Sequence, residues 1–352
     1  VQNFGKTKFN LNSTTTVGNT LLTVGGGATT GMDWAGVEVN PGSFTFTPST
    51  YDARLFTAVH NGSGISFSNY APYGAKEKIV GDLEYSLDTD NHTGNAAQDV
   101  FINGFQFRNR TATYTETPAH DEAWAGRTNI GNKVEKNTLT VSGGTITTAA
   151  YGGLVINNKP SATMGDAEKN TVNIAGGTVA NVYGAQVRTK AGSASENTAK
   201  ISGGTVSHVY GASLTAAGAT GSVTKSRVDV TGGAVTGDVY GGQIVDTGAT
   251  GSVTESQVNL TGGSVGGSVY GGRTNGSGFA KDNTVNITGG TLHDVYGGFA
   301  QAGKATGNTV NLGTATNAVA AGTSVGTIWG SNSGSAGNTL NVNSRQANAA
   351  DV

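Results

Sequence analysis

The sequence of 352 residues contains no cysteine and only five prolines. The lack of cysteine excludes disulfide bonds, thiol catalysis and zinc sites with cysteine ligands. With so little proline, the 57 glycines cannot belong to a collagen repeat, in which both residue types are abundant. Glycine, threonine, asparagine and valine fill much of the chain and are poor helix formers. We therefore expect an all-β chain with many turns.

Charge and long hydrophobic runs are also scarce. The 21 basic and 23 acidic residues give a formal net charge of -2, and no basic block stands out, so we expect no nucleic-acid partner. No run of about 18 apolar residues and no basic amphipathic segment is present, which argues against direct membrane insertion. The chain begins at Val1 without a signal-peptide pattern. We expect it to be a fragment of a longer, processed protein.

The chain does contain two repeated phrases. The first reads Asn-Thr-Val-Asn-Ile-Ala-Gly-Gly from Asn170 to Gly177. Copies or variants of it begin at Asn137, Asn197, Ser226, Ser256 and Asn283. The second phrase, Val-Tyr-Gly-Gly or Val-Tyr-Gly-Ala, follows most copies of the first, and its tyrosines recur every 26 to 30 residues. This period is typical of one coil of a three-faced β-solenoid and is too short for a propeller blade.

Each first phrase predicts a strand followed by a turn. Val172 and Ile174 alternate with Thr171 and Asn173, as in a strand with one buried face, and the Gly-Gly pair then turns the chain. Asn19-Thr-Leu-Leu-Thr-Val begins an earlier copy, with Trp34 in place of tyrosine. We predict one continuous solenoid of about ten or eleven coils: irregular coils with long insertions in residues 1–135, regular coils in 136–343 and a truncated end in 344–352.

The combination of Gly-Gly-Thr-Val with Val-Tyr-Gly-Gly, stacked without cysteine, resembles the passenger domains of monomeric type V bacterial autotransporter adhesins over about residues 19–343. The resemblance implies a single-stranded, right-handed parallel β-helix outside a Gram-negative cell, anchored to the outer membrane through a C-terminal β-barrel. No alternating strands with aromatic girdles follow residue 343, so we expect that barrel to lie outside this fragment. The resemblance further implies a host or bacterial surface protein or glycan as partner, or self-association during biofilm formation.

Aromatic residues give the first candidate site. One tyrosine per coil forms a predicted ladder that could contact sugars or apolar peptide side chains. Stacked rings also commonly stabilise neighbouring coils, and the sequence leaves open whether tyrosine or the preceding valine points inward. The candidate ligand-binding residues are Tyr183, Tyr210, Tyr240, Tyr270 and Tyr296, with Tyr151 extending the ladder.

The asparagines that open the first phrase form a second predicted ladder, which we interpret as structural. Their amides can hydrogen-bond from coil to coil along the rod. The positions are Asn137, Asn170, Asn197, Asn283, Asn308 and Asn338.

The residues before Val-Tyr are the place to look for glycan-cleaving carboxylates. Asp238 and Asp294 would lie two coils apart, roughly 9.6 Å, at the upper limit for an inverting pair, but an exposed column is not a cleft. His208 and His293, about three coils apart, cannot share a metal. The stretch from Asp88 to Gly94 lacks the closing glutamate of a calcium loop. We expect no catalytic residues, no metal and no cofactor.

The insertions carry more individual information than the repeats. Aromatic residues concentrate in residues 50–115, and long loops often hold binding residues, so we predict contact surfaces in 82–99 and 108–121. Three functions stay open: a surface adhesin, a glycan-cleaving β-helix enzyme, and a structural spacer for a binding region elsewhere.

Overall fold

The computed structural model describes residues 4–25, 29–44, 55–62, 65–80, 83–91, 98–107, 109–115, 119–128, 133–156, 165–313, 318–332 and 337–343. The chain forms two compact units, made mainly of residues 1–108 and 109–352. In these ranges the only helix is the single 3-10 turn η1 (Trp34–Gly36). The described residues contain no helix that is long and apolar enough to cross a membrane. The prediction of an all-β chain is confirmed.

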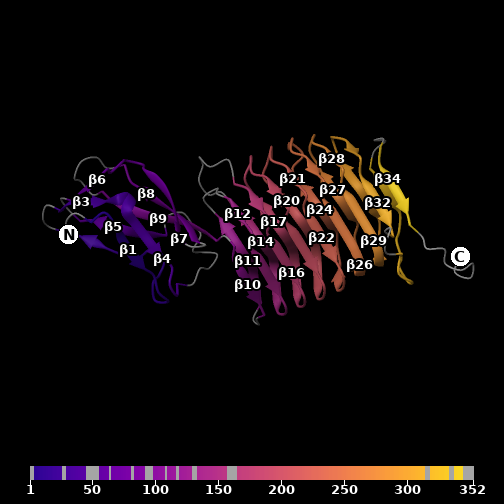
Figure 1. Ribbon diagram of the computed structural model, residues 1–352, viewed down its shortest axis with the longest axis horizontal. Coiled ribbons are helices and arrows are strands. Elements are labelled where there is room, and N and C mark those ends of the chain that lie inside the picture. Colours follow the sequence, from indigo (N-terminus) through magenta and orange to yellow (C-terminus); the bar gives the residue numbers. More distant parts are fainter. Residues whose placement is uncertain are drawn as a thin grey trace, which may run out of the picture. The chain divides into compact units, whose positions relative to one another are not determined.

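The second unit is a β-solenoid of about nine turns, with parallel strands stacked coil upon coil (Figure 1). The predicted β-solenoid is confirmed, with about nine coils where the sequence suggested ten or eleven, because the regular stacking begins with β10. The turns have three faces. The strands of the first face carry the asparagine phrase: β10 (Thr111–Tyr114), β13 (Thr138–Val141), β16 (Thr171–Ile174), β19 (Thr198–Ile201), β22 (Arg227–Val230), β26 (Gln257–Val265), β29 (Thr284–Leu292), β32 (Thr309–Leu312) and β34 (Thr339–Val342).

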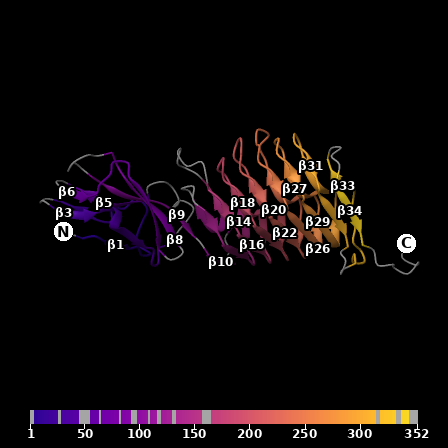
Figure 2. The ribbon, with the colours of Figure 1, turned by 45° about the horizontal axis from the view of Figure 1, so that its top comes forward.

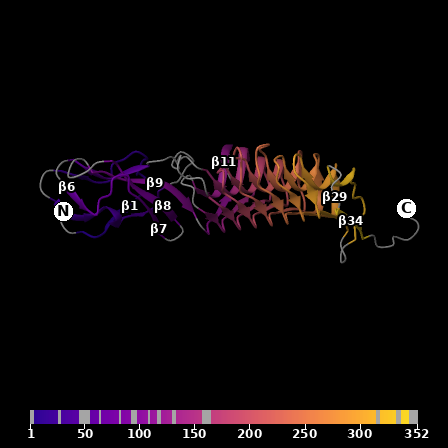
Figure 3. The ribbon, with the colours of Figure 1, turned by 90° about the horizontal axis from the view of Figure 1, so that it is seen from above.

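The second face carries the tyrosine phrase, and the third face is narrow (Figures 2 and 3). The second face comprises β11 (His120–Thr128), β14 (Thr145–Val155), β17 (Thr178–Val187), β20 (Thr205–Leu214), β23 (Ala234–Val235), β24 (Val239–Ile244), β27 (Val269–Thr274), β30 (Val295–Ala300) and β33 (Ile328–Ser331). The third face consists of two-residue strands: β12 (Val134–Glu135), β15 (Ala167–Glu168), β18 (Ala194–Ser195), β21 (Val223–Thr224), β25 (Val253–Thr254), β28 (Ala280–Lys281) and β31 (Ala305–Thr306).

The core of this unit is a stack of small branched side chains. Val172 and Ile174 are fully buried, whereas Thr171 and Asn173 on the same strand are only half-buried, as the alternation predicted. Parallel pairing in register places Val172 over Leu139 and below Ala199. The turn after the strand requires glycine: Gly177 has φ +83°, and a Cβ there would lie 2.6 Å from the carbonyl oxygen of Gly144 in the neighbouring coil.

The predicted asparagine ladder is confirmed. Asn170 is fully buried, and its Oδ1 accepts hydrogen bonds from the backbone N–H and the Nδ2 of Asn137, at 3.2 and 2.9 Å. Its own Nδ2 donates to the carbonyl oxygen of Val134 and to Oδ1 of Asn197, both at 3.0 Å. Asn283, Asn308 and Asn338 repeat this pattern. Ser226 and Ser256 interrupt the ladder in two coils.

The first unit departs from the predicted irregular coils. Some of its strands pair in parallel, but its largest sheet is antiparallel along β5, β9, β8 and β7, a pairing direction that a β-helix does not use. The strands are β1 (Thr7–Asn10), β2 (Thr23–Val24), β3 (Thr29–Asp33), β4 (Val37–Asn40), β5 (Phe56–Asn61), β6 (Ile65–Ser68), β7 (Ala75–Val80), β8 (Leu83–Thr89) and β9 (Val100–Phe107).

The physical reason for this departure is the side-chain content of residues 55–107. Large side chains replace the small branched ones of the repeats and fill a separate core, in which Phe56 and Tyr85 are fully buried and Phe67 and Phe101 nearly so. The hydroxyl of Tyr85 accepts a hydrogen bond from the backbone N–H of Val39 at 2.7 Å. These four aromatic residues pack within the unit, whereas Tyr73 is 76% exposed.

In the two stretches predicted as contact loops, most of the described residues belong to strands. Residues 83–89 form β8, and residues 111–114 form β10, the first described strand of the solenoid. Residues 82, 92–97, 108 and 116–118 lie outside the described residues. The role of the two stretches as contact surfaces stays a prediction.

The asparagine ladder yields a stability prediction. Asn170→Ala should lower the free energy of unfolding by about 3 kcal/mol, because four hydrogen bonds to groups of Asn137, Val134 and Asn197 are lost in the core. Urea unfolding followed by circular dichroism measures this change. The matched control, Asn173→Ala on the outer side of the same strand, should cost under about 1 kcal/mol. Equal losses in both variants would contradict a special role for the ladder.

Candidate functional site

The tyrosines of the second phrase form one continuous stack on the second face. Their ring centroids are 4.5 to 5.3 Å apart from Tyr151 to Tyr296, with interplanar angles of 4° to 12°. Trp329 extends the stack at 6.1 Å beyond Tyr296. Parallel pairing in register, as between Tyr183 and Tyr210, places one ring directly over the next. The structure therefore brings all five predicted ligand-binding residues together.

The valine before each tyrosine faces the core, and the tyrosine lies on the opposite side of the strand. Val182, Val209 and Val239 are fully buried within the main apolar cluster, to which no ladder tyrosine belongs. The rings are nevertheless well covered, with Tyr240 only 4% and Tyr270 only 9% exposed. The sequence left this orientation open because the alternation of a strand does not say which set of side chains is inside.

Neighbouring rings cover the faces of each tyrosine, which limits what the ladder can bind. Sugars stack on the face of an aromatic ring, and inside the ladder both faces are occupied by the next tyrosines. Arg273 adds further cover, since its guanidinium carbon lies 5.3 Å from the ring centroid of Tyr270 and 5.8 Å from that of Tyr240. Only the rims of the rings and the end of the stack at Trp329, which is 46% exposed, reach solvent. Ligand binding by the five tyrosines stays a prediction.

Burial and neighbouring groups shift the tyrosines toward their neutral form. Burial is the main cause that raises the pKa of Tyr151, Tyr183, Tyr210 and Tyr270. Burial also raises the pKa of Tyr240, and the hydrogen bond that its hydroxyl donates to Asp238 at 2.7 Å adds to the effect. These five tyrosines therefore keep their phenolic protons to a higher pH than an exposed tyrosine does, because their pKa is raised.

The side chains that precede Val-Tyr, considered above for glycan cleavage, are engaged in hydrogen bonds between coils. Asp238 accepts hydrogen bonds from the Tyr240 hydroxyl and, at 2.8 Å, from the backbone N–H of Ser268. Asp294 accepts from the backbone N–H of Thr327 at 3.0 Å. His208 likewise accepts from the N–H of Asp238 through Nδ1, at 3.0 Å. Each of these side chains connects its coil to the next.

The described residues contain no cluster of three or more histidine, aspartate or glutamate side chains that could hold a metal ion. In the calcium-loop candidate, Asp88 lies in β8, and Asp90 accepts a short hydrogen bond from the hydroxyl of Tyr70. His92, Thr93 and Gly94 lie outside the described residues.

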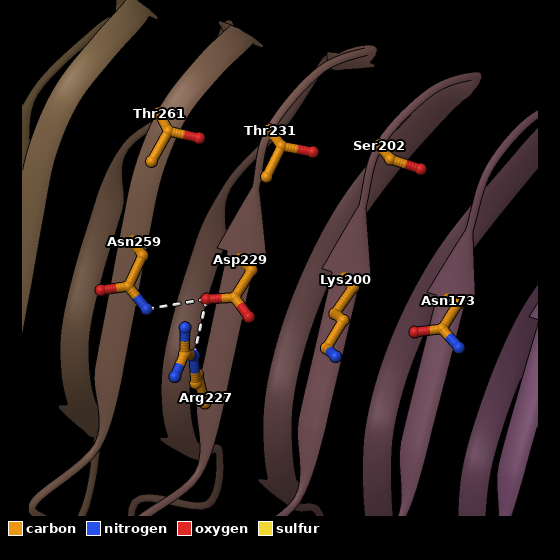
Figure 4. A pocket seen from close by; sticks show the side chains of 8 residues that line it. All are labelled: Asn173, Lys200, Ser202, Arg227, Asp229, Thr231, Asn259 and Thr261. Carbon is orange, nitrogen blue, oxygen red and sulfur yellow. Dashed lines mark hydrogen bonds and ion pairs between the residues drawn. The ribbon is translucent and has the colours of Figure 1, made fainter.

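The outer side of the first face carries a shallow polar groove of about 390 Å³. It spans four consecutive coils, on strands β16, β19, β22 and β26 (Figure 4). Two rows of outward-facing side chains line it, together with an arginine beside the lower row. The lining residues are Asn173, Lys200, Asp229 and Asn259 in one row, Ser202, Thr231 and Thr261 in the other, and Arg227.

Asp229 organises the floor of the groove. Its side chain is only 14% exposed, and its Oδ1 accepts hydrogen bonds from Nε of Arg227 at 2.6 Å and from Nδ2 of Asn259 at 2.7 Å. The Oδ1 of Asn259 accepts from Asn286, whose own Oδ1 accepts from Asn311 at 2.6 Å. This outer asparagine ladder runs along the first face and fixes the amide of Asn259 from the side opposite Asp229.

Sequence reasoning missed this groove, although a signal for it exists. The fourth position of the first phrase is asparagine in the copies that begin at 170, 256, 283 and 308, but it is lysine at Lys200 and aspartate at Asp229. The arginine at Arg227 replaces the threonine found at Thr171 and Thr284. Charges that interrupt a neutral column in adjacent coils mark a place where the outer surface differs from the rest of the repeat.

The raised tyrosine pKa values predict a loss of stability in alkali. In an unfolded chain tyrosine ionises near pH 10, whereas the folded ladder keeps its protons to higher pH. The folded state then binds more protons than the unfolded state, so the free energy of unfolding falls as pH rises above about 10. Urea unfolding between about pH 8 and pH 12 measures this slope. The double variant Tyr240→Phe with Tyr270→Phe should show a shallower slope, and an unchanged slope would contradict the assignment.

No protein-family model matches this chain, and neither the curated proteins nor the solved structures contain a match to it.

Proposed function

We propose that this chain is the binding shaft of an extracellular adhesin, displayed on a bacterial cell surface in the manner of an autotransporter passenger. The polar groove on the first face carries the proposal, because it offers charged and hydrogen-bonding side chains from four coils to a ligand in solution. The resemblance of the repeated phrases to such passengers supports the same function.

A long, regular surface suits adhesion for a physical reason. Coils stacked in register repeat the same backbone at about 4.8 Å intervals, so an extended ligand can contact several coils at once. Many copies on one cell then bind with an avidity that exceeds the affinity of any single groove. The partner in this proposal is a protein or glycan on a host cell or on a neighbouring bacterium, and a second copy of the chain would give self-association.

The groove and the tyrosine ladder predict different outcomes in a cell-binding assay. Fluorescently labelled protein should bind host or bacterial cells saturably, and unlabelled protein should compete. The double variant Lys200→Gln with Arg227→Gln should bind about tenfold more weakly, because it removes both cations of the groove. The matched variant Tyr183→Phe with Tyr210→Phe keeps the stacked rings, so it should retain binding.

Circular dichroism should confirm that both variants are folded. Loss of binding in the tyrosine variant alone would show that the ligand binds at the rim of the tyrosine ladder and not in the groove. Absence of saturable binding to every cell tested would overturn the adhesin proposal and favour a spacer.

A further inference from the structure

We propose that the groove on the first face binds the carboxylate of an acidic sugar in an oligosaccharide. This inference rests on the proposed function, since it names the ligand class that the groove would recognise on a cell surface.

The cations of the groove differ in how fully they are engaged. Arg227 donates from its Nε to Asp229, and among the described residues its terminal nitrogens have no carboxylate partner. Lys200 is exposed on the neighbouring strand β19 and takes part in no ion pair in the described part of the chain. Figure 4 shows both side chains in the lower part of the groove, Lys200 on β19 and Arg227 on β22, with the guanidinium of Arg227 turned toward Asp229. Two cations against one carboxylate leave a net positive charge there.

The rest of the lining suits the hydroxyl groups of a sugar. Asn173 presents an amide, and Asn259 keeps the second N–H of its Nδ2 beside the bond to Asp229. The second row presents three hydroxyls, of Ser202, Thr231 and Thr261; those of Ser202 and Thr231 donate to backbone carbonyl oxygens of the neighbouring coil and keep their acceptor capacity. Amides and hydroxyls both donate and accept hydrogen bonds, as sugar hydroxyls do. A purely anionic ligand such as sulfate would contact the cations but not the row of hydroxyls. An acidic sugar would contact the cations through its carboxylate and the hydroxyl row through its own hydroxyl groups.

The size and position of the groove agree with a short oligosaccharide. A volume of about 390 Å³ lies within the range of small-ligand sites, and the four coils that line it lie side by side at about 4.8 Å per coil. The groove is open to solvent, so water competes for every polar group and a single site should be weak, with a dissociation constant on the order of millimolar.

The test compares matched sugars on the folded protein. Isothermal titration with 3′-sialyllactose and with digalacturonate should give saturable binding, whereas lactose, which lacks the carboxylate, should bind at least about fivefold more weakly. Lys200→Gln should weaken binding of both acidic sugars about fivefold, and Lys200→Arg should restore most of it. The control Lys281→Gln, a cation on the third face, should leave the affinity unchanged.

Three results would overturn the inference. Lactose binding as tightly as sialyllactose would show a neutral-sugar site, and inorganic sulfate competing as well as either acidic sugar would show a simple anion site. No binding of the acidic sugars at about 10 mM, in a protein that still binds cells, would refute the groove assignment while leaving the adhesin proposal intact. Sugar binding in a protein that binds no cell would do the reverse.

Discussion

The amide of each buried asparagine accepts hydrogen bonds from the coil on one side and donates to the coil on the other, and the solenoid depends on this contact. A buried amide left without partners costs free energy, so where two neighbouring coils both carry the asparagine they must sit where the two amides meet. In the two coils that carry Ser226 and Ser256, backbone pairing and the buried valines hold the same register. Sliding one coil by a residue would separate the amides and would turn the buried valines outward.

A fixed register turns every outward position into a straight column, and the chemistry of a column depends on how its members meet. Aromatic side chains in a column stack face to face, as in the tyrosine ladder. The next ring then covers the ring face on which a ligand would stack. Asparagines on the outer side of the first face hydrogen-bond to one another, so their amide groups are already engaged within the column. Lys200 and Asp229 interrupt that column, and the groove there holds Lys200, which takes part in no ion pair among the described residues, beside the ion pair of Arg227 with Asp229.

Contacts between coils also explain why individual acidic residues are poor guides to catalysis in such a fold. Asp238 and Asp294 both accept hydrogen bonds from the backbone N–H groups of the following coil. A carboxylate engaged in this way stabilises the stack and is held in place by it. Function in a solenoid is therefore best sought where the repeat is interrupted on the outside while the inside stays regular.

The sequence by itself determined the all-β class, the three-faced parallel coil and the buried asparagine ladder, because these follow from local alternation and from a strict period. Only the tertiary structure decided that the valine before each tyrosine is the inward residue, since alternation is symmetric between the two sides of a strand. It also decided the antiparallel sheet of residues 56–107, whose pairing joins segments that share no repeated phrase. The groove came last, because its residues lie 27 to 30 positions apart and only the stacking of coils brings Lys200, Arg227 and Asp229 beside Asn173 and Asn259.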